Sequence, residues 1–290
     1  MGDFFNREKM WFGTERKMGW IETPMTGADV SPIGFGTSAT GMNGFGYVRN
    51  SWDSHKNYQF GWGESADLGL ASKIHAYRNG TYGRGLIYFH DPMYYGTNIL
   101  PRRLADPSMA INHEAEPLIQ GLWPRSTPTP NNANDLPVET AIYDVPAGYD
   151  SEASGSELFV PIPPGFTLYV GSVYSSSGSA SLYFRTPSGR TDFTQSSHNT
   201  LNLHPQNVSG EWARIGIQNP GGVKSAISLS AVSARLVPPG ESANVSGPWM
   251  SGEGNSGCQF VGSPTLINYN GVNGGQVGIA CTLAETGAWE

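Results

Sequence analysis

The stretch TYGRGLIYFHDPMYYGTNILP, residues 81 to 101, places a His-Asp pair among glycines and aromatic residues. A histidine beside a carboxylate can serve in acid/base catalysis when the surroundings shift the pKa values of both groups. Here Asp91 precedes Pro92 and follows an apolar run typical of a strand. An aspartate in that place usually closes a turn by accepting a hydrogen bond from a backbone N–H. We therefore interpret His90 and Asp91 as the end of a strand followed by a turn.

Other carboxylates that could act in acid/base catalysis are present, but they do not form a recognised catalytic motif. Asp106, Glu114 and Glu116 are acid/base candidates by residue type alone. The sequence has no G-x-S-x-G motif and no Ser/His/Asp set at a recognisable spacing. We expect that the protein is not an enzyme, and we assign no catalytic residue.

Metal and cofactor sites lack a local signature as well. The histidines form no H-x-H or H-x-x-x-H pair, and two isolated cysteines cannot form a zinc knuckle; these residues are His55, His75, His90, His113, His198, His204, Cys258 and Cys281. The run GFGTSA, residues 34 to 39, fits a loose dinucleotide-binding pattern, with Asp53 downstream. A phosphate site needs a helix start directly afterwards, and TGMNGFG cannot provide one. We interpret this run as a glycine-rich loop and expect no cofactor and no metal.

Charge and hydropathy argue against a DNA-binding, a membrane-spanning or a secreted protein. The net charge is -7 and no Lys/Arg cluster opposes it, so tight DNA binding is not expected. No run approaches the roughly 20 apolar residues of a membrane span, and the first residues lack the pattern of a signal peptide. Folding in a reducing cytosol is expected, where Cys258 and Cys281 would be buried thiols in preference to a disulfide.

Abundant glycine (38 residues) and proline (21 residues) favour a mainly β fold of short strands and turns. The first part, residues 1–125, contains one helix in residues 65–80, with Leu70, Ile74 and Tyr77 at helical spacing. Ser65 can cap its start, and the single apolar stripe predicts that the helix covers a sheet. Together these features predict a β-rich first domain with one covering helix.

A linker and a second domain follow. Residues 124–137 are rich in Pro, Asn and Thr, which is typical of an extended linker. Residues 138–240 alternate with period two and predict an antiparallel β-sandwich, with a bulge near Ala231. The inward-pointing residues are expected to be Phe166, Leu168, Val170, Leu182, Phe184, Ala213, Ile215 and Ile217.

The last part, residues 245–290, ends in a strand that is too short to fold alone. We expect it to return and pair with the sheet of the first part, which makes the sandwich an insertion. On the exposed faces of the sandwich we expect Tyr169, Tyr183, Arg185 and Trp212. Such rings can stack on sugar faces while Arg185 reaches hydroxyls. The alternative is that they pack against the first domain or a neighbouring subunit.

Two segments carry a family resemblance. GYVRNSWDSHKNYQFGW (46 to 62), the helix, and NGTYGRGLIYFHDPMYYGTNILP (79 to 101) resemble the N-terminal half of minor tail proteins of phages that infect actinobacteria. SGEGNSGCQFVGSPT and LAETGAWE, near the other end, resemble the closing segment of the same proteins. Departures are Gly85-Leu86, where the family pattern has Gly-Pro, and Arg102-Arg103 after Pro101.

The resemblance implies a structural virion protein of the phage tail tip, similar to a distal tail protein and assembled in the host bacterial cytoplasm. Its partners would be copies of itself in a hexameric or trimeric ring, the tail tube and other tail-tip proteins. The inserted sandwich would face outward and contact host cell-wall glycan. A carbohydrate-active enzyme, which requires two converging carboxylates, and a free-standing carbohydrate-binding protein stay open as alternatives.

A ring of such subunits would have a bore through which DNA passes. Because every subunit carries a net charge of -7, acidic groups in the bore would repel the phosphate backbone and let DNA slide. We therefore expect Lys56, Arg102 and Arg103 to face subunit contacts or the outside of the ring.

Overall fold

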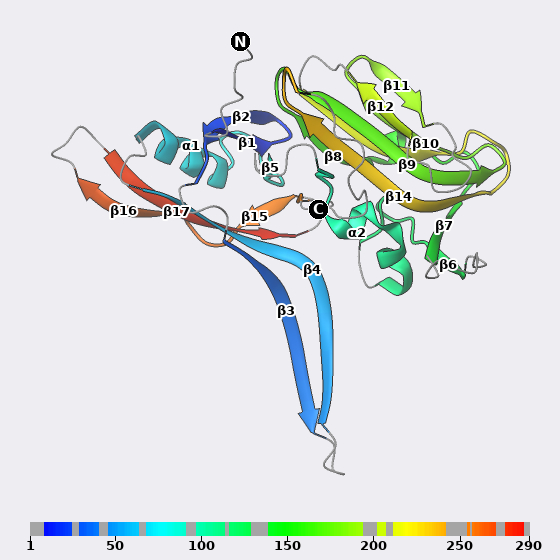
Figure 1. Cartoon of the computed structure of the whole chain (residues 1–290), viewed down its shortest axis with the longest axis horizontal. Helices are drawn as coiled ribbons and strands as arrows, with labels where there is room; N and C mark the ends of the chain where they lie inside the picture. Colours follow the sequence, from blue (N-terminus) through cyan, green and yellow to red (C-terminus); the bar gives the residue numbers. More distant parts are fainter. Residues whose placement is uncertain are drawn as a thin grey trace.

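The structure, a computed structural model, describes residues 9–24, 29–40, 46–63, 68–90, 97–113, 116–128, 139–193, 202–206, 211–241, 254–255, 257–270 and 276–286. These residues form antiparallel sheets in two neighbouring units, and a long two-stranded arm extends from one of them (Figure 1). The predicted mainly β fold is thus confirmed. One unit is a sandwich, and the other holds the N-terminal and C-terminal strands.

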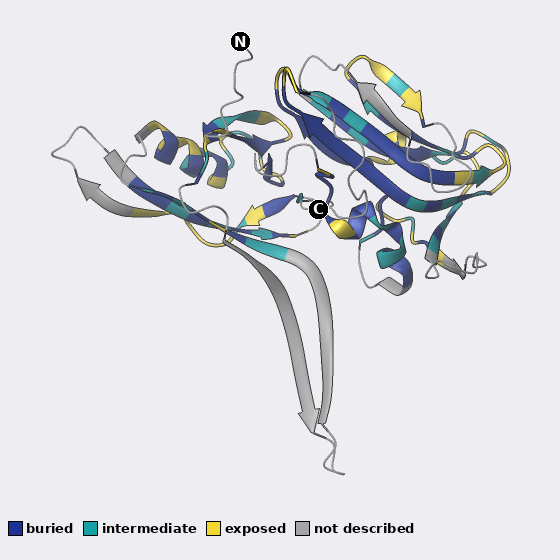
Figure 2. Ribbon diagram, viewed as in Figure 1, coloured by how far each residue is buried: buried dark blue, intermediate teal, exposed yellow. Residues whose placement is uncertain are grey.

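The sandwich consists of a five-stranded sheet of order β12-β9-β14-β7-β6 and a four-stranded sheet of order β11-β10-β13-β8. Its strands are β6 (Arg125–Pro128), β7 (Glu139–Val145), β8 (Leu158–Ile162), β9 (Thr167–Ser177), β10 (Ser181–Thr186), β11 (Gly189–Asp192), β12 (Asn202–Gln206), β13 (Glu211–Gln218) and β14 (Ser225–Val237). Buried residues run along β9 and β14 (Figure 2). The register of β14 against β9 shifts between Leu229 and Ala231, so the predicted bulge is confirmed.

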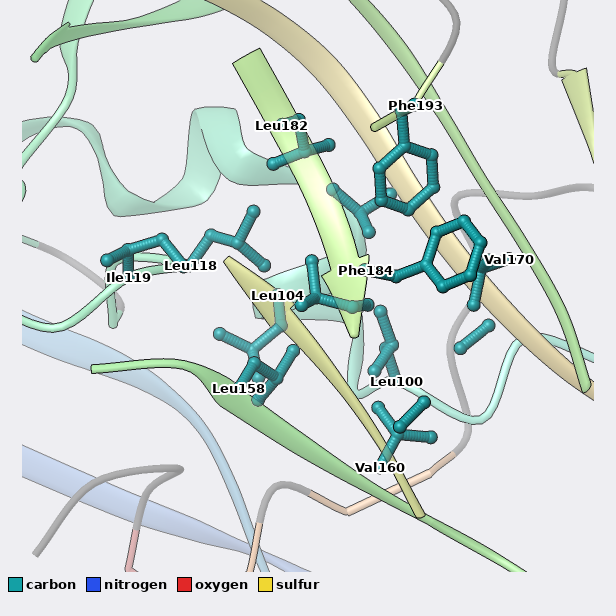
Figure 3. Packing of buried hydrophobic residues seen from close by; sticks show 14 of the residues in the cluster. Leu100, Leu104, Leu118, Ile119, Leu158, Val160, Val170, Leu182, Phe184 and Phe193 are labelled. Carbon is teal, nitrogen blue, oxygen red and sulfur yellow. The ribbon is translucent and has the colours of Figure 1, made fainter. Parts of the chain in front are cut away.

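The core between the two sheets follows the predicted alternation. All eight residues expected to point inward are buried: Phe166, Leu168, Val170, Leu182, Phe184, Ala213, Ile215 and Ile217. Leu182, Phe184 and Val170 lie among side chains from both sheets (Figure 3). Alternate residues of a strand point to opposite faces, so one face of each sheet supplies this core.

Residues from the described ranges 97–113 and 116–123 also belong to this core, although the linker predicted at 124–137 would leave them in the first domain. Leu100, Leu104, Leu118 and Ile119 pack in the same apolar cluster as the sandwich strands (Figure 3). Leu104 comes from α2 (Arg102–Ala105), and the other three come from the loops before α2 and after the 3₁₀ helix η2 (Pro107–His113). The described part of the predicted linker includes β6, which pairs with β7.

Asn98 fastens this segment to β14. Its Nδ2 donates to the carbonyl of Val232 over 3.1 Å, and its Oδ1 accepts from the backbone N–H of Ala234 over 3.1 Å. The backbone N–H of Ile99 donates to the Ala234 carbonyl over 2.8 Å. Because Asn98 is fully buried, these bonds satisfy an amide that would otherwise be costly to bury.

The second unit contains a three-stranded sheet of order β2-β1-β5 and a sheet of order β15-β17-β4-β3, with β16 paired to β17. The elements are β1 (Lys9–Thr14), β2 (Lys17–Glu22), β3 (Asp29–Thr40), β4 (Gly46–Trp62), α1 (Leu68–Arg78), β5 (Tyr88–His90), β15 (Cys258–Phe260), β16 (Thr265–Asn270) and β17 (Gln276–Glu285). Leu70, Ile74 and Tyr77 of α1 are buried in a cluster with residues of both sheets, as the helical spacing predicts. The proposed cap Ser65 lies outside the described residues.

The last strand, β17, lies beside a strand from the N-terminal part of the chain. β17 pairs antiparallel with β4, with Ile279 opposite Trp62 and Ala284 opposite Asn57. The predicted return of the C-terminal strand to the N-terminal sheet is therefore confirmed. Cys258 and Cys281 are free and buried, as expected, and burial raises the pKa of Cys281 to about 12.

β3 and β4 form the arm that extends away from both units (Figure 1). The prediction that GFGTSA, residues 34 to 39, is a glycine-rich loop is wrong, because these residues lie within β3 and pair with β4. Of the strand β4, only Asn57–Trp62 pairs with β17. Thus the part of the hairpin beyond Lys56 has no further strand beside it among the described residues.

Candidate functional site

The predicted stacking residues do not share one surface. Tyr169 alternates with the inward residues Leu168 and Val170 of β9, so it lies on the outer face of the five-stranded sheet. Tyr183, Arg185 and Trp212 lie on β10 and β13, on the outer face of the four-stranded sheet. The stacking hypothesis requires Tyr169, Tyr183 and Trp212 to share one exposed face, and the structure places them on two different sheets.

Tyr183 is not exposed at all. Its relative accessibility is 0%, and the guanidinium carbon of Arg190 lies 3.4 Å from the ring centroid. The hydroxyl donates to Oε1 of Glu157 over 3.0 Å. Burial and the neighbouring Glu157 carboxylate raise the pKa of Tyr183 far above its ordinary value, so the phenol stays protonated. The ring points outward as predicted, but charged side chains cover it.

Gly216, directly across from Tyr183 on β13, provides the space for this ring. A Cβ atom at Gly216 would lie 2.4 Å from Cζ of Tyr183. We expect Gly216→Ala to lower the free energy of unfolding by about 1–3 kcal/mol, because the buried ring cannot move without breaking its bonds to Glu157. Urea denaturation checks this. Gly222→Ala is the control, since a Cβ there meets no atom within 4 Å, and equal effects of the two changes would contradict the prediction.

Arg185 is occupied by acidic neighbours. Its Nε donates to Oε1 of Glu157 over 3.0 Å and lies 3.4 Å from Oε1 of Glu152. The bond to Glu157 is the largest contribution to a pKa of Arg185 above its ordinary value. The guanidinium also lies 5.2 Å from the ring centroid of Trp212. Arg185 therefore holds the sheet surface together and is not free to bind a sugar hydroxyl.

Trp212 packs at the border between the two units. It lies against a small apolar cluster whose buried members are Leu86, Tyr88 and Phe159. Arg214, two residues along β13, bonds Oε2 of Glu15 over 2.6 Å, and Glu15 stands in the turn between β1 and β2. For Trp212, the alternative of packing against the first domain is therefore confirmed.

Two clefts flank the β1–β2 turn at this border. The first, of about 310 Å³, is lined by Thr14, Glu15, Arg16, Arg84, Gly85, Leu86, Tyr88, Gln120, Gly155, Glu157 and Arg214. The second, of about 380 Å³, is lined by Trp11, Glu15, Arg16, Lys17, Met18, Phe159, Ile162, Pro164 and Trp212. Glu15 and Arg16 line both clefts. Glu15 and Arg16 were not predicted as site residues. In the sequence, only the glycine-rich run NGTYGRG at 79–85 indicates an unusual loop beside them.

His90 has a structural position. It ends β5 and its Nε2 donates to the carbonyl oxygen of Pro161 in β8 over 2.7 Å, within a buried contact between the units. This agrees with the interpretation of His90 as the end of a strand. Asp91 and Glu114 lie outside the described residues. Asp106 closes a turn, because its Oδ1 accepts a hydrogen bond from the backbone N–H of Ser108 over 3.2 Å.

The expectation that Arg102 and Arg103 face subunit contacts or the outside of the ring is wrong for Arg103. Arg102 is exposed, but Arg103 is fully buried, with Nη1 3.1 Å from Oε2 of Glu285 and Nε 3.5 Å from Oε2 of Glu116. Lys56, which is half-buried, donates its backbone N–H to the same Glu285 oxygen over 3.1 Å. Arg103 thus forms an ion cluster inside the chain, because Glu285 and Glu116 compensate its charge where water cannot.

Within the residues that the structure describes, no group of three or more His, Cys, Asp or Glu side chains could hold a metal ion. None of the helices in that part of the chain has the length and apolar character that crossing a bilayer requires. The chain matches no family model and no curated protein. What the fold and contacts define is a mainly β protein in which a sandwich is docked against a second β unit with a projecting arm.

Proposed function

We propose that the protein is a structural subunit of a phage tail tip, which assembles with copies of itself into a ring between the tail tube and the tip. The observation that carries this proposal is the β3–β4 arm, since it extends beyond the rest of the second unit (Figure 1). The family resemblance of both chain ends supports the same role. Like other virion structural proteins, such a subunit needs rigid β units and contact surfaces and no catalytic pair.

An isolated two-stranded hairpin is at best marginally stable in water, and its two edges carry unpaired N–H and C=O groups. β3 is an edge strand along its whole length, and β4 lacks a second neighbour before Asn57 among the described residues. A strand from a neighbouring subunit would satisfy these backbone groups. The arm therefore supports assembly through strand pairing between copies.

Removing the arm tests this role. Replacing residues 35–51 with Asn-Gly keeps the pair Gly34–Trp52 beside a tight turn and leaves the sheet with β17 intact. We expect wild-type protein to form rings in negative-stain images and a multimeric mass in light scattering, and the shortened chain to remain monomeric. Lys73→Gln, an exposed change on α1, is the control and should not alter the mass. Wild-type protein that stays monomeric at every concentration, and equals the shortened chain, would favour a free-standing carbohydrate-binding protein.

The ring should not retain DNA. With a net charge of -7 on each subunit, a bore lined mainly by Asp and Glu repels phosphates. We expect no shift of double-stranded DNA by the assembled ring at physiological salt. Tight binding that weakens steeply with added salt would contradict this prediction, because it indicates neutralisation of phosphates by lysine and arginine.

The sandwich is the part that we propose to face outward and contact host cell-wall glycan. Tyr169 is half-buried on its own sheet, and Trp212 contacts the second unit, so neither belongs to an open platform. The clefts beside the β1–β2 turn are a better place for such a contact, because they combine aromatic rings with charged groups.

A further inference from the structure

Two arginines at the first cleft have no compensating charge among the residues that the structure describes. Arg16 in the β1–β2 turn and Arg84 in the 79–85 loop are exposed and both line the cleft. Among the described residues, neither forms an ion pair or a side-chain hydrogen bond. In a chain with a net charge of -7, two uncompensated guanidinium groups beside one cavity provide a local positive site.

The glycines of the loop leave room for both arginine side chains to lie against its backbone. A Cβ at Gly83 would lie 2.8 Å from Cδ of Arg16, and a Cβ at Gly80 would lie 3.0 Å from Cγ of Arg84. Both glycines have positive φ, +105° and +73° respectively, which fixes the course of the loop. Thr14 Oγ1 donates to the carbonyl of Tyr82 over 2.8 Å and joins the turn to the loop. The two arginine stems therefore lie against a shaped and tethered backbone.

The acidic groups of the same cleft are already used. Glu15 bonds Arg214 over 2.6 Å, and Glu157 bonds Arg185 and the hydroxyl of Tyr183. Once these pairs are counted, the cleft keeps the positive charges of Arg16 and Arg84 and the neutral amide of Gln120. Guanidinium groups bind carboxylate and phosphate oxygens through paired N–H donors.

The second cleft, on the other side of the turn, offers a different chemistry. Its lining includes the rings of Trp11, Phe159 and Trp212, together with Lys17. Glu15 and Arg16 line this cleft as well as the first, and because Glu15 is paired with Arg214, Arg16 is the cation that links the anion site to the aromatic wall. A sugar with an acidic substituent matches this combination, because its apolar ring face suits aromatic side chains and its oxyanion suits arginine.

We propose that the paired clefts bind an acidic saccharide, with Arg16 and Arg84 on its carboxylate or phosphate and the aromatic wall beside its ring. This inference rests on the proposed contact with host glycan and assigns that contact to the border of the two units. The overall negative charge favours a short acidic sugar segment over a nucleic acid, since a long polyanion would meet repulsion from the rest of the surface.

Titration calorimetry with the full-length protein tests the proposal. The ligands are hexagalacturonate as the carboxylated sugar, glucose 6-phosphate as the phosphorylated sugar, a neutral hexose oligomer, inorganic phosphate and a single-stranded DNA hexamer. We expect at least one acidic sugar to bind, and the double change Arg16→Gln/Arg84→Gln to weaken it about ten-fold or more. The control Arg102→Gln removes the same charge from an exposed site on α2 and should leave the affinity unchanged.

The remaining outcomes decide against the proposal. It is overturned if no acidic sugar binds, if the double change leaves the affinity intact, or if the neutral oligomer binds equally well. Equal affinity for inorganic phosphate or the DNA hexamer would show a general anion surface and overturn the assignment to saccharide. Light scattering of the same samples reports assembly separately, so loss of sugar binding with intact rings would leave the structural role standing.

Discussion

Replacing Arg103 with methionine is expected to lower the free energy of unfolding by about 3–5 kcal/mol. The change removes the cation that faces Glu285 at 3.1 Å and leaves that carboxylate buried, with 3% of its surface exposed. An uncompensated buried charge is costly because the surrounding protein cannot solvate it as water does. The loss would affect both units, since Arg103 lies on α2 beside the sandwich core and Glu285 ends β17.

The charges in this cluster depend on one another. Burial lowers the pKa of the Arg103 guanidinium, but the carboxylates of Glu285 and Glu116 outweigh that effect and hold the pKa above its ordinary value. Burial and the Glu285 carboxylate together raise the pKa of the neighbouring Cys258 thiol well above its ordinary value. Both results follow from a compact arrangement in which Arg103 and Glu285 compensate each other.

Chemical denaturation of three variants measures the effect. Arg102→Met is the matched control, because it makes the same change at the preceding, exposed position and should cost little. Adding Glu285→Leu to Arg103→Met should restore most of the lost stability, since a buried pair can be replaced by apolar side chains without large cost. If Arg103→Met and Arg102→Met behave alike, the ion cluster does not stabilise the fold.

The sandwich core could be predicted from the sequence because its signal is local. Each strand carries its own alternation, so residues such as Leu182 and Ile215 were placed correctly without knowledge of which strands pair. The bulge near Ala231 was visible for the same reason, as a change of face within one strand. The helical stripe of α1 is likewise contained in one short segment.

The predictions that were wrong concern residues whose burial depends on contacts between distant segments of the chain. Tyr183 points outward as its position in β10 predicts, but its burial results from Arg190 on the next strand and Glu157 just before β8. Arg103 was expected at subunit contacts or on the outside of the ring, because acidic groups were assigned to the bore. Its partner Glu285 comes from the far end of the chain, so no local sequence pattern predicts the ion pair.

The candidate site was the least predictable part. Arg16 and Arg84 are ordinary surface residues in the sequence, and the clefts exist only because the β1–β2 turn meets the sandwich. The arm was missed for another reason. Glycine weakens a strand and is typical of loops, so the run at residues 34–39 gave no sign that it pairs along β4.

Acid is expected to destabilise the protein through His90 before its carboxylates are fully protonated. Burial lowers the pKa of His90 from 6.5 to about 4, and the hydrogen bond to the Pro161 carbonyl offsets only part of that effect. Since Nε2–H already donates to this carbonyl, a second proton would go to Nδ1 of a ring that is 8% exposed. The folded state therefore favours the neutral imidazole at this buried contact between β5 and β8.

The direction of the pH dependence follows from proton binding. Between pH 6.5 and pH 4, His90 is protonated in the unfolded chain and neutral in the folded chain. The unfolded state therefore binds more protons, and the free energy of unfolding falls as the pH falls. The contribution is fully present above pH 6.5 and is lost by pH 4, a difference of about 3 kcal/mol at 1.36 kcal/mol for each pH unit.

Urea denaturation of wild-type and His90→Gln protein over this range checks this pH dependence, because glutamine keeps an N–H donor for Pro161 and does not titrate. His75→Gln, a change on α1, is the control and should follow the wild-type curve. A wild-type curve parallel to that of His90→Gln would contradict the prediction.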